Sequence, residues 1–240
     1  MKLYHLEGED NMGLIGALIT GAVSIISTVV STIGPTIASA TSALITKLPM
    51  EVLKAKTIMD GISFIISKVA EFFGLVPKDE KIEELGAKAM QEDTRPQMEG
   101  ETTQEYLDYL RKDVQLDEEK YTQMSDTEKL ACSALGTTIV SKSIQEKFGV
   151  ELSPDFLVTM YKTKMKYEQV TKFIENFSNN GFTSMNQLTK YITNDLSEVQ
   201  AQKIGGVIKT SLKELNPDLS NSDIQKQIVD MKREYNSAEL

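Results

Sequence analysis

The sequence has no tryptophan, one cysteine and one histidine in 240 residues. A single cysteine excludes a disulfide within the chain. Cys132 and His5 together cannot supply the three or four ligands of a usual zinc site. His5 lies in an acidic, polar stretch at the N-terminus, which favours a solvated side chain over a catalytic base. We therefore expect no metal site and no histidine-based catalytic triad.

Other signatures of chemistry are also missing. The sequence contains no Gly-x-x-x-x-Gly-Lys-Ser/Thr phosphate loop, and its N-terminal glycines neither follow a predicted strand nor precede a lysine. Carboxylates are frequent at 79–84 and 117–119, where a solvated charged surface is a more common explanation than an acid–base pair. We expect no catalytic residue, no cofactor and no enzymatic activity.

Positive charge is sparse relative to negative charge. The net charge is −9, and residues 78–129 carry 16 acidic against 8 basic side chains, which accounts for nearly all of the excess. An acidic chain without a basic stripe repels phosphate, so nucleic acid is not expected as a partner.

A long N-terminal segment has no charge at all. No charged residue occurs from 11 to 46, and 15 of these 36 residues are Gly, Ser or Thr. The stretch 13–33 predicts a helix that Gly34 and Pro35 end, and 35–48 predicts a second, shorter helix. The acidic residues before the run argue against a secretory signal peptide. The segment is an apolar helical hairpin that suits burial, membrane contact or contact with another subunit.

The small residues of the first predicted helix recur with spacings of four and three. They form one stripe, which would let a partner helix approach closely. The stripe consists of Ala17, Gly21, Ser24, Thr28 and Ser31. Membrane contact, a buried hairpin in a soluble core and burial in an oligomer all fit this pattern.

Residues 52–73 predict an amphipathic helix. Ile62, Ile66, Val69 and Phe73 belong to its apolar stripe, and lysines and acidic residues occupy the other face. Such a helix can lie in a membrane interface or face a protein core. We assign these four residues, with the stripe of small residues, to membrane contact or helix packing.

The rest of the chain predicts short helices and no strand. We expect an apolar N-terminal region at 1–77, an acidic linker at 78–101 and a soluble helical domain at 102–240. Capping boxes at Thr102/Glu105 and Ser125/Glu128 mark helix starts, and the helix that follows Ser125 is apolar nearly all round. The predicted fold class is all-α, with a C-terminal bundle of short helices.

Two functions from different classes remain open. The leading hypothesis is a non-enzymatic membrane-interacting helical protein. Examples of this class are a delivered pore former and a virion-associated or injection-apparatus component. The alternative is a soluble structural or adaptor subunit of a phage or tail-like assembly. In both, residues 11–76 contact the membrane or partner subunits, the protein is an oligomer or part of a larger assembly, and its location is a membrane or a particle.

Overall fold

In the computed structural model, residues 9–238 are described, and for residues 9–17 only the backbone is described. The helices are α1 (Glu9–Thr28), α2 (Val30–Ile45), α3 (Val52–Phe72), α4 (Ile82–Ala89), α5 (Thr103–Lys112), α6 (Glu118–Gln123), α7 (Asp126–Phe148), α8 (Pro154–Lys162), α9 (Tyr167–Asn179), α10 (Asn186–Thr193), α11 (Glu198–Leu215) and α12 (Asn221–Ser237). Within 9–238 the only β-type pairing is one isolated bridge, between Glu151 and Ser184. The all-α prediction is confirmed.

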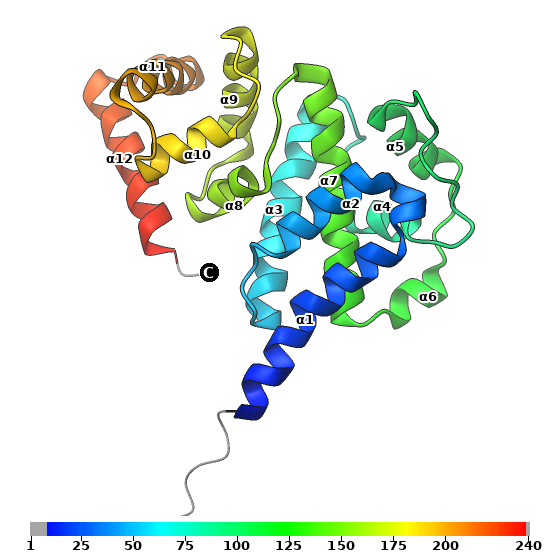
Figure 1. Ribbon diagram of the computed structural model, residues 1–240. Helices are drawn as coiled ribbons and strands as arrows, with labels where there is room; N and C mark the ends of the chain where they lie inside the picture. Colours follow the sequence, from blue (N-terminus) through cyan, green and yellow to red (C-terminus); the bar gives the residue numbers. More distant parts are fainter. Residues whose placement is uncertain (1–8, 239–240) are drawn as a thin grey trace, which may run out of the picture.

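Helix α7 is the centre of the N-terminal part of the fold. It packs against α1, α2, α3, α4 and α5, which surround it in Figure 1. Its residues from Leu130 to Ser141 are all buried, as the nearly uninterrupted apolar sequence predicted. A helix buried on every side needs partners on every side, and this requirement explains why five helices gather around it.

Helices α8 to α12 form the other side of the molecule in Figure 1, with α9 packed against α11 and α10 against α8 and α11. Helix α3 contacts both groups, because it touches α7 as well as α8 and α9. The buried apolar side chains of the described residues form one continuous core cluster.

The chain of α1 and α2 has two breaks, where the sequence predicted one. Gly34 leaves the helical conformation with φ 77° and ψ 155°, immediately before Pro35, as the Gly-Pro pair predicted. A second break, at Val29, was not predicted: its φ is −102° and its ψ is 11°. α1 and α2 pack against each other and against α7.

The segment 78–101, which we expected to be a linker, includes α4, and α4 is packed closely against α7. A Cβ atom added to Gly86 would lie 1.9 Å from the carbonyl oxygen of Cys132, and one added to Gly136 would lie 1.9 Å from that of Ile82. The two backbones therefore touch where each helix lacks a side chain. These contacts join residues on the two sides of the expected boundary.

Helix starts follow the local sequence closely. Thr102 and Glu105 form the predicted capping box of α5, and Ser125 and Glu128 form that of α7, with both reciprocal hydrogen bonds present. The side-chain oxygen satisfies a backbone N–H that the helix leaves free, so the signal depends on four residues and not on the tertiary fold.

Candidate functional site

The predicted stripe of small residues is divided between the interior and the surface. Ser24, Thr28 and Ser31 are exposed, whereas Gly21 is partly buried and a Cβ added there would lie 3.1 Å from Cγ2 of Thr127. Ala17 lies in α1, and its side chain is outside the described part. The inward face of the hairpin is instead formed by apolar and mostly larger side chains: Leu18, Ile26 and Ile33 are buried, together with the smaller Ala22. Larger apolar groups gain more from burial, so they take the core side.

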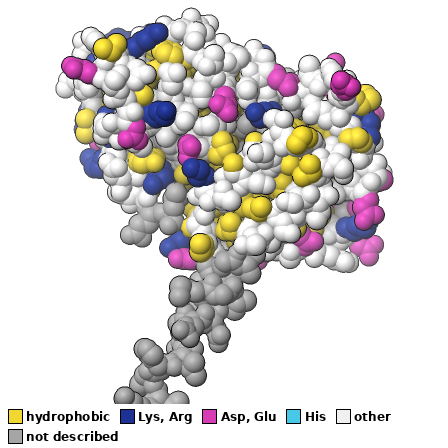
Figure 2. Space-filling view, in the orientation of Figure 1, with side chains coloured by type: hydrophobic (Ala, Val, Ile, Leu, Met, Phe, Trp, Pro, Cys, Tyr) yellow, Lys and Arg dark blue, Asp and Glu magenta, His cyan; other side chains and the backbone are white. Residues whose placement is uncertain are grey.

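The exposed side of the hairpin forms a surface without charge. We use the name uncharged face for the exposed hydroxyl residues of α1 and the start of α2, which are Thr20, Ser24, Ser27, Thr28 and Ser31. Figure 2 shows white and yellow side chains gathered where α1 and α2 lie, with charged groups mainly around them. Among the 18-residue and longer helices of the described chain, none is apolar enough to cross a membrane.

The predicted residues of α3 lie in the core. Ile62, Ile66 and Val69 are fully buried, and Phe73 is partly buried with its ring 4.1 Å from that of Phe148. Their role in this structure is helix packing within the chain. The apolar groups that α3 exposes are others, and Phe64, which is 61% exposed, was not singled out because it lies outside the stripe.

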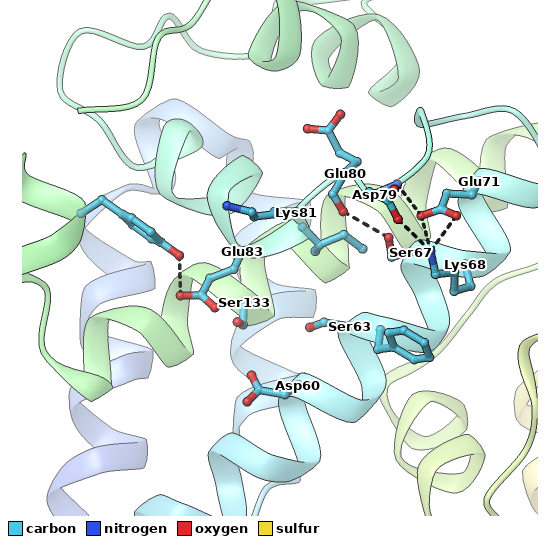
Figure 3. A pocket seen from close by; sticks show the side chains of 13 residues that line it. Asp60, Ser63, Ser67, Lys68, Glu71, Asp79, Glu80, Lys81, Glu83 and Ser133 are labelled. Atoms are coloured by element: carbon cyan, nitrogen blue, oxygen red, sulfur yellow. Dashed lines mark hydrogen bonds and ion pairs between the residues drawn. The ribbon is translucent and has the colours of Figure 1, made fainter. Parts of the chain in front are cut away.

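Phe64 stands at the rim of a groove between α3 and α4, which has a volume of about 400 Å³. Figure 3 shows the groove from close by, with side chains from α3, α4, α7 and the loop before α4 facing into it. The lining residues are Asp60, Ser63, Phe64, Ser67, Lys68, Glu71, Asp79, Glu80, Lys81, Ile82, Glu83, Tyr121 and Ser133. Five carboxylates face two ammonium groups, so the groove is acidic.

One end of the groove is neutralised by its own residues. Lys68 Nζ lies 2.9 Å from Glu71 and 3.6 Å from Asp79, and Arg111 Nε lies 3.0 Å from Glu80. The hydroxyl of Ser67 donates to the carbonyl of Glu80 at 3.2 Å. This end is a closed network of ion pairs and hydrogen bonds.

The other end of the groove keeps its negative charge. Asp60 and Glu83 form no ion pair with any residue of the described chain, and the Tyr121 hydroxyl donates to Glu83 at 2.8 Å. Burial in the groove, and secondly the charge of Glu83, raise the pKa of the Asp60 carboxyl. Burial, followed by the hydrogen bond to Glu83, raises the pKa of Tyr121. The charge of Lys56 acts in the opposite direction on Asp60 but does not outweigh these two effects, so the two carboxylates share a partly desolvated space in which neither forms an ion pair within the described residues.

The sequence indicated this site only weakly. The carboxylates at 79–84 were interpreted as a solvated surface, and Asp60 and Ser133 lie far from them along the chain. Folding α4 between α3 and α7 brings the three segments together. The contact between these three segments cannot be predicted from the local sequence.

Metal ligands do not cluster in the described residues, where no group of three or more His, Cys, Asp and Glu side chains converges.

Cys132 is fully buried, and burial raises the pKa of its thiol to about 12. Its Sγ lies 3.6 Å from Sδ of Met90 and 3.7 Å from Sδ of Met124. The thiol is therefore a packed, protonated core group.

Comparison with protein-family models, with curated protein sequences and with solved structures finds no match to this chain. Its fold and its surfaces are therefore the basis for assigning a function.

Proposed function

We propose that this protein is a non-enzymatic structural or adaptor subunit that associates with a second copy of itself through the uncharged face of α1 and α2. The observation that carries the proposal is the division of the N-terminal run. Its large apolar side chains, such as Leu18, Ile26 and Ile33, are in the core, whereas eight of the eleven Ser and Thr residues from 18 to 46 are exposed.

Charge favours a second copy as the occupant. The chain has a net charge of −9, so two copies repel each other at most relative orientations. Residues 11–46 have no charge, and a contact made there brings no like charges together. Small side chains at Ser24, Ser27 and Thr28 also allow a facing helix to approach closely.

A membrane is less well suited to this face. Binding to a bilayer interface scales with the apolar area that enters it, and the exposed positions between residues 18 and 28 of α1, the part whose side chains are described, are hydroxyl residues. The large exposed apolar residues nearest in sequence, Met50, Val52 and Leu53, lie in the turn that follows α2 and at the start of α3. They are too few to form the continuous apolar face of an interfacial helix.

Substitution of Ser24 by Glu tests the proposal. In a twofold contact each residue of the face occurs twice, so Ser24→Glu places two carboxylates in one interface. We expect wild-type protein to dimerise in light scattering coupled to size exclusion, and Ser24→Glu to weaken the dimer at least tenfold. Gly21→Leu is a poor test, since the added side chain would meet Thr127 inside the fold.

Thr210→Glu is the matched control, because Thr210 is an exposed residue in the middle of α11, remote in sequence from the hairpin. It should leave the dimer intact. A monomer at about 100 µM, or equal dimerisation of both variants, would refute the proposal. Flotation of the wild type with phosphatidylcholine vesicles, lost in Ser24→Glu, would instead assign the face to a membrane.

A further inference from the structure

The unneutralised end of the groove contains an unused hydroxyl. Ser133, on α7, is only 4% exposed and lines the groove, and its Oγ has no hydrogen-bond partner among the described residues. A serine within a helix ordinarily satisfies its hydroxyl with the carbonyl four residues earlier. The Oγ atom is not among the fully buried unpaired polar atoms of the described residues, so it is accessible from the groove, where a ligand or a water can form hydrogen bonds with it.

Three acceptors from three helices surround the same space. Asp60 comes from α3, Glu83 from α4 and Ser133 from α7, and Figure 3 shows the three side chains facing one another. A primary ammonium has three N–H donors in a tetrahedral arrangement and no acceptor. Three separate acceptors match this group better than they match the flat, forked guanidinium, which pairs with a single carboxylate.

The lysines near the groove do not fill the space between Asp60, Glu83 and Ser133. Lys56 Nζ lies 3.4 Å from Asp126, Lys68 lies 2.9 Å from Glu71, and Lys81 is paired with Glu84. Each ammonium near the groove therefore already has a carboxylate that lies outside the set of three acceptors. Asp60 and Glu83 together carry a charge that an incoming cation would neutralise.

We propose that Asp60, Glu83 and Ser133 form a binding site for a primary ammonium group. The ammonium donates one hydrogen bond to each of the three side chains, while Tyr121 holds Glu83 in position through its hydrogen bond of 2.8 Å. The exposed ring of Phe64 lies at the rim, where it contacts the alkyl chain that carries the ammonium. The ligand is either a lysine side chain of a partner or a small free amine.

Calorimetric titration with n-butylamine at pH 7 tests the site. We expect saturable binding, and we expect Asp60→Asn and Ser133→Ala to weaken it at least tenfold and at least threefold respectively. Butyltrimethylammonium has the same charge but no N–H donor, so it should bind at least tenfold more weakly than butylamine.

Two matched variants separate the site from general effects. Asp218→Asn removes an exposed carboxylate that lies outside the groove, and Ser141→Ala removes a fully buried serine hydroxyl of α7 that lacks a partner in the described chain and lies outside the groove. Both should bind butylamine as the wild type does. Since burial raises the pKa of the Asp60 carboxyl, Asp60→Asn should fold without loss of stability, and loss of binding would not reflect unfolding.

The source of the ammonium is distinguished by two further titrations. A blocked Ala-Lys-Ala peptide that binds more tightly than butylamine indicates a lysine of a partner protein. Tighter binding of 1,4-diaminobutane indicates a free amine. Binding of butylamine that is absent, or that Asp60→Asn and Asp218→Asn reduce equally, would overturn the proposal.

Discussion

Gly86 on α4 lies directly against the backbone of Cys132 on α7, so that a Cβ atom at Gly86 would be 1.9 Å from the Cys132 carbonyl oxygen. A reciprocal contact joins Gly136 to the carbonyl of Ile82. This pair of contacts sets the distance between α4 and α7, and therefore the width of the groove that Glu83 and Ser133 share.

Gly86→Ala should destabilise the fold strongly. The added methyl overlaps a backbone atom, which cannot rotate away as a side chain could, so the two helices must separate. We expect a loss of about 3 kcal/mol, at the upper end of overpacking effects, measured as a lower urea midpoint. Gly206→Ala in α11 is the control, since no atom lies within 4 Å of the added methyl. It should stabilise by about 0.5–1 kcal/mol, and equal effects of the two changes would contradict the close contact.

Ser125→Ala should weaken the start of the central helix. The change removes the hydroxyl that accepts from the backbone N–H of Glu128 and leaves that N–H without its cap. The expected loss is about 1 kcal/mol, read from urea unfolding. Thr210→Ala, at an exposed helical position without a side-chain hydrogen bond in the described structure, should have no destabilising effect. A Ser125→Ala variant as stable as the wild type would show that the cap contributes nothing.

Stability should fall in acid partly through Glu101. Its carboxylate accepts from Arg95 at 2.7 and 2.9 Å and from the Met98 N–H at 2.8 Å, and these interactions lower its pKa in the folded protein. A lowered folded-state pKa stabilises the fold above the unfolded value of about 4.3. This stabilisation disappears as the pH falls through the folded value.

Glu101→Gln should therefore be less stable than the wild type at pH 7, and the difference should shrink at pH 3. Urea midpoints at the two pH values measure it. Glu92→Gln, an exposed carboxylate with no ion pair in the described residues, provides the matched control. A constant difference between wild type and Glu101→Gln across this range would contradict the linkage.

Cys132 should be inert in the folded protein. It is fully buried and its pKa is raised to about 12, so little thiolate forms at pH 8 and none is accessible. We expect no reaction with Ellman's reagent over an hour in buffer, and complete reaction in urea. A Thr210→Cys variant adds an exposed thiol and should react with one equivalent in buffer. Rapid reaction of the native wild type would mean that α7 is accessible through local opening.

Local signals in the sequence determined much of the secondary structure. The Ser125/Glu128 box begins α7 and Gly34-Pro35 breaks the hairpin because caps and breakers act over a few residues. The apolar stripe of α3 indicated that Ile62, Ile66 and Val69 contact apolar neighbours, and the three side chains are buried. An apolar stripe does not indicate whether that neighbour is lipid, another subunit or the chain itself, since all three remove the same apolar surface area from water.

The tertiary structure determined which elements pack against each other. It placed the large side chains of the N-terminal run inside and most of its hydroxyls outside, because one core could bury only one side of each helix. It also packed α4, within the segment expected to be a linker, against α7, where two glycines allowed the backbones to touch. The groove with Asp60, Glu83 and Ser133 exists for the same reason. These residues are distant in sequence and come together only because α3, α4 and α7 pack against each other. No short-range sequence pattern predicts this contact.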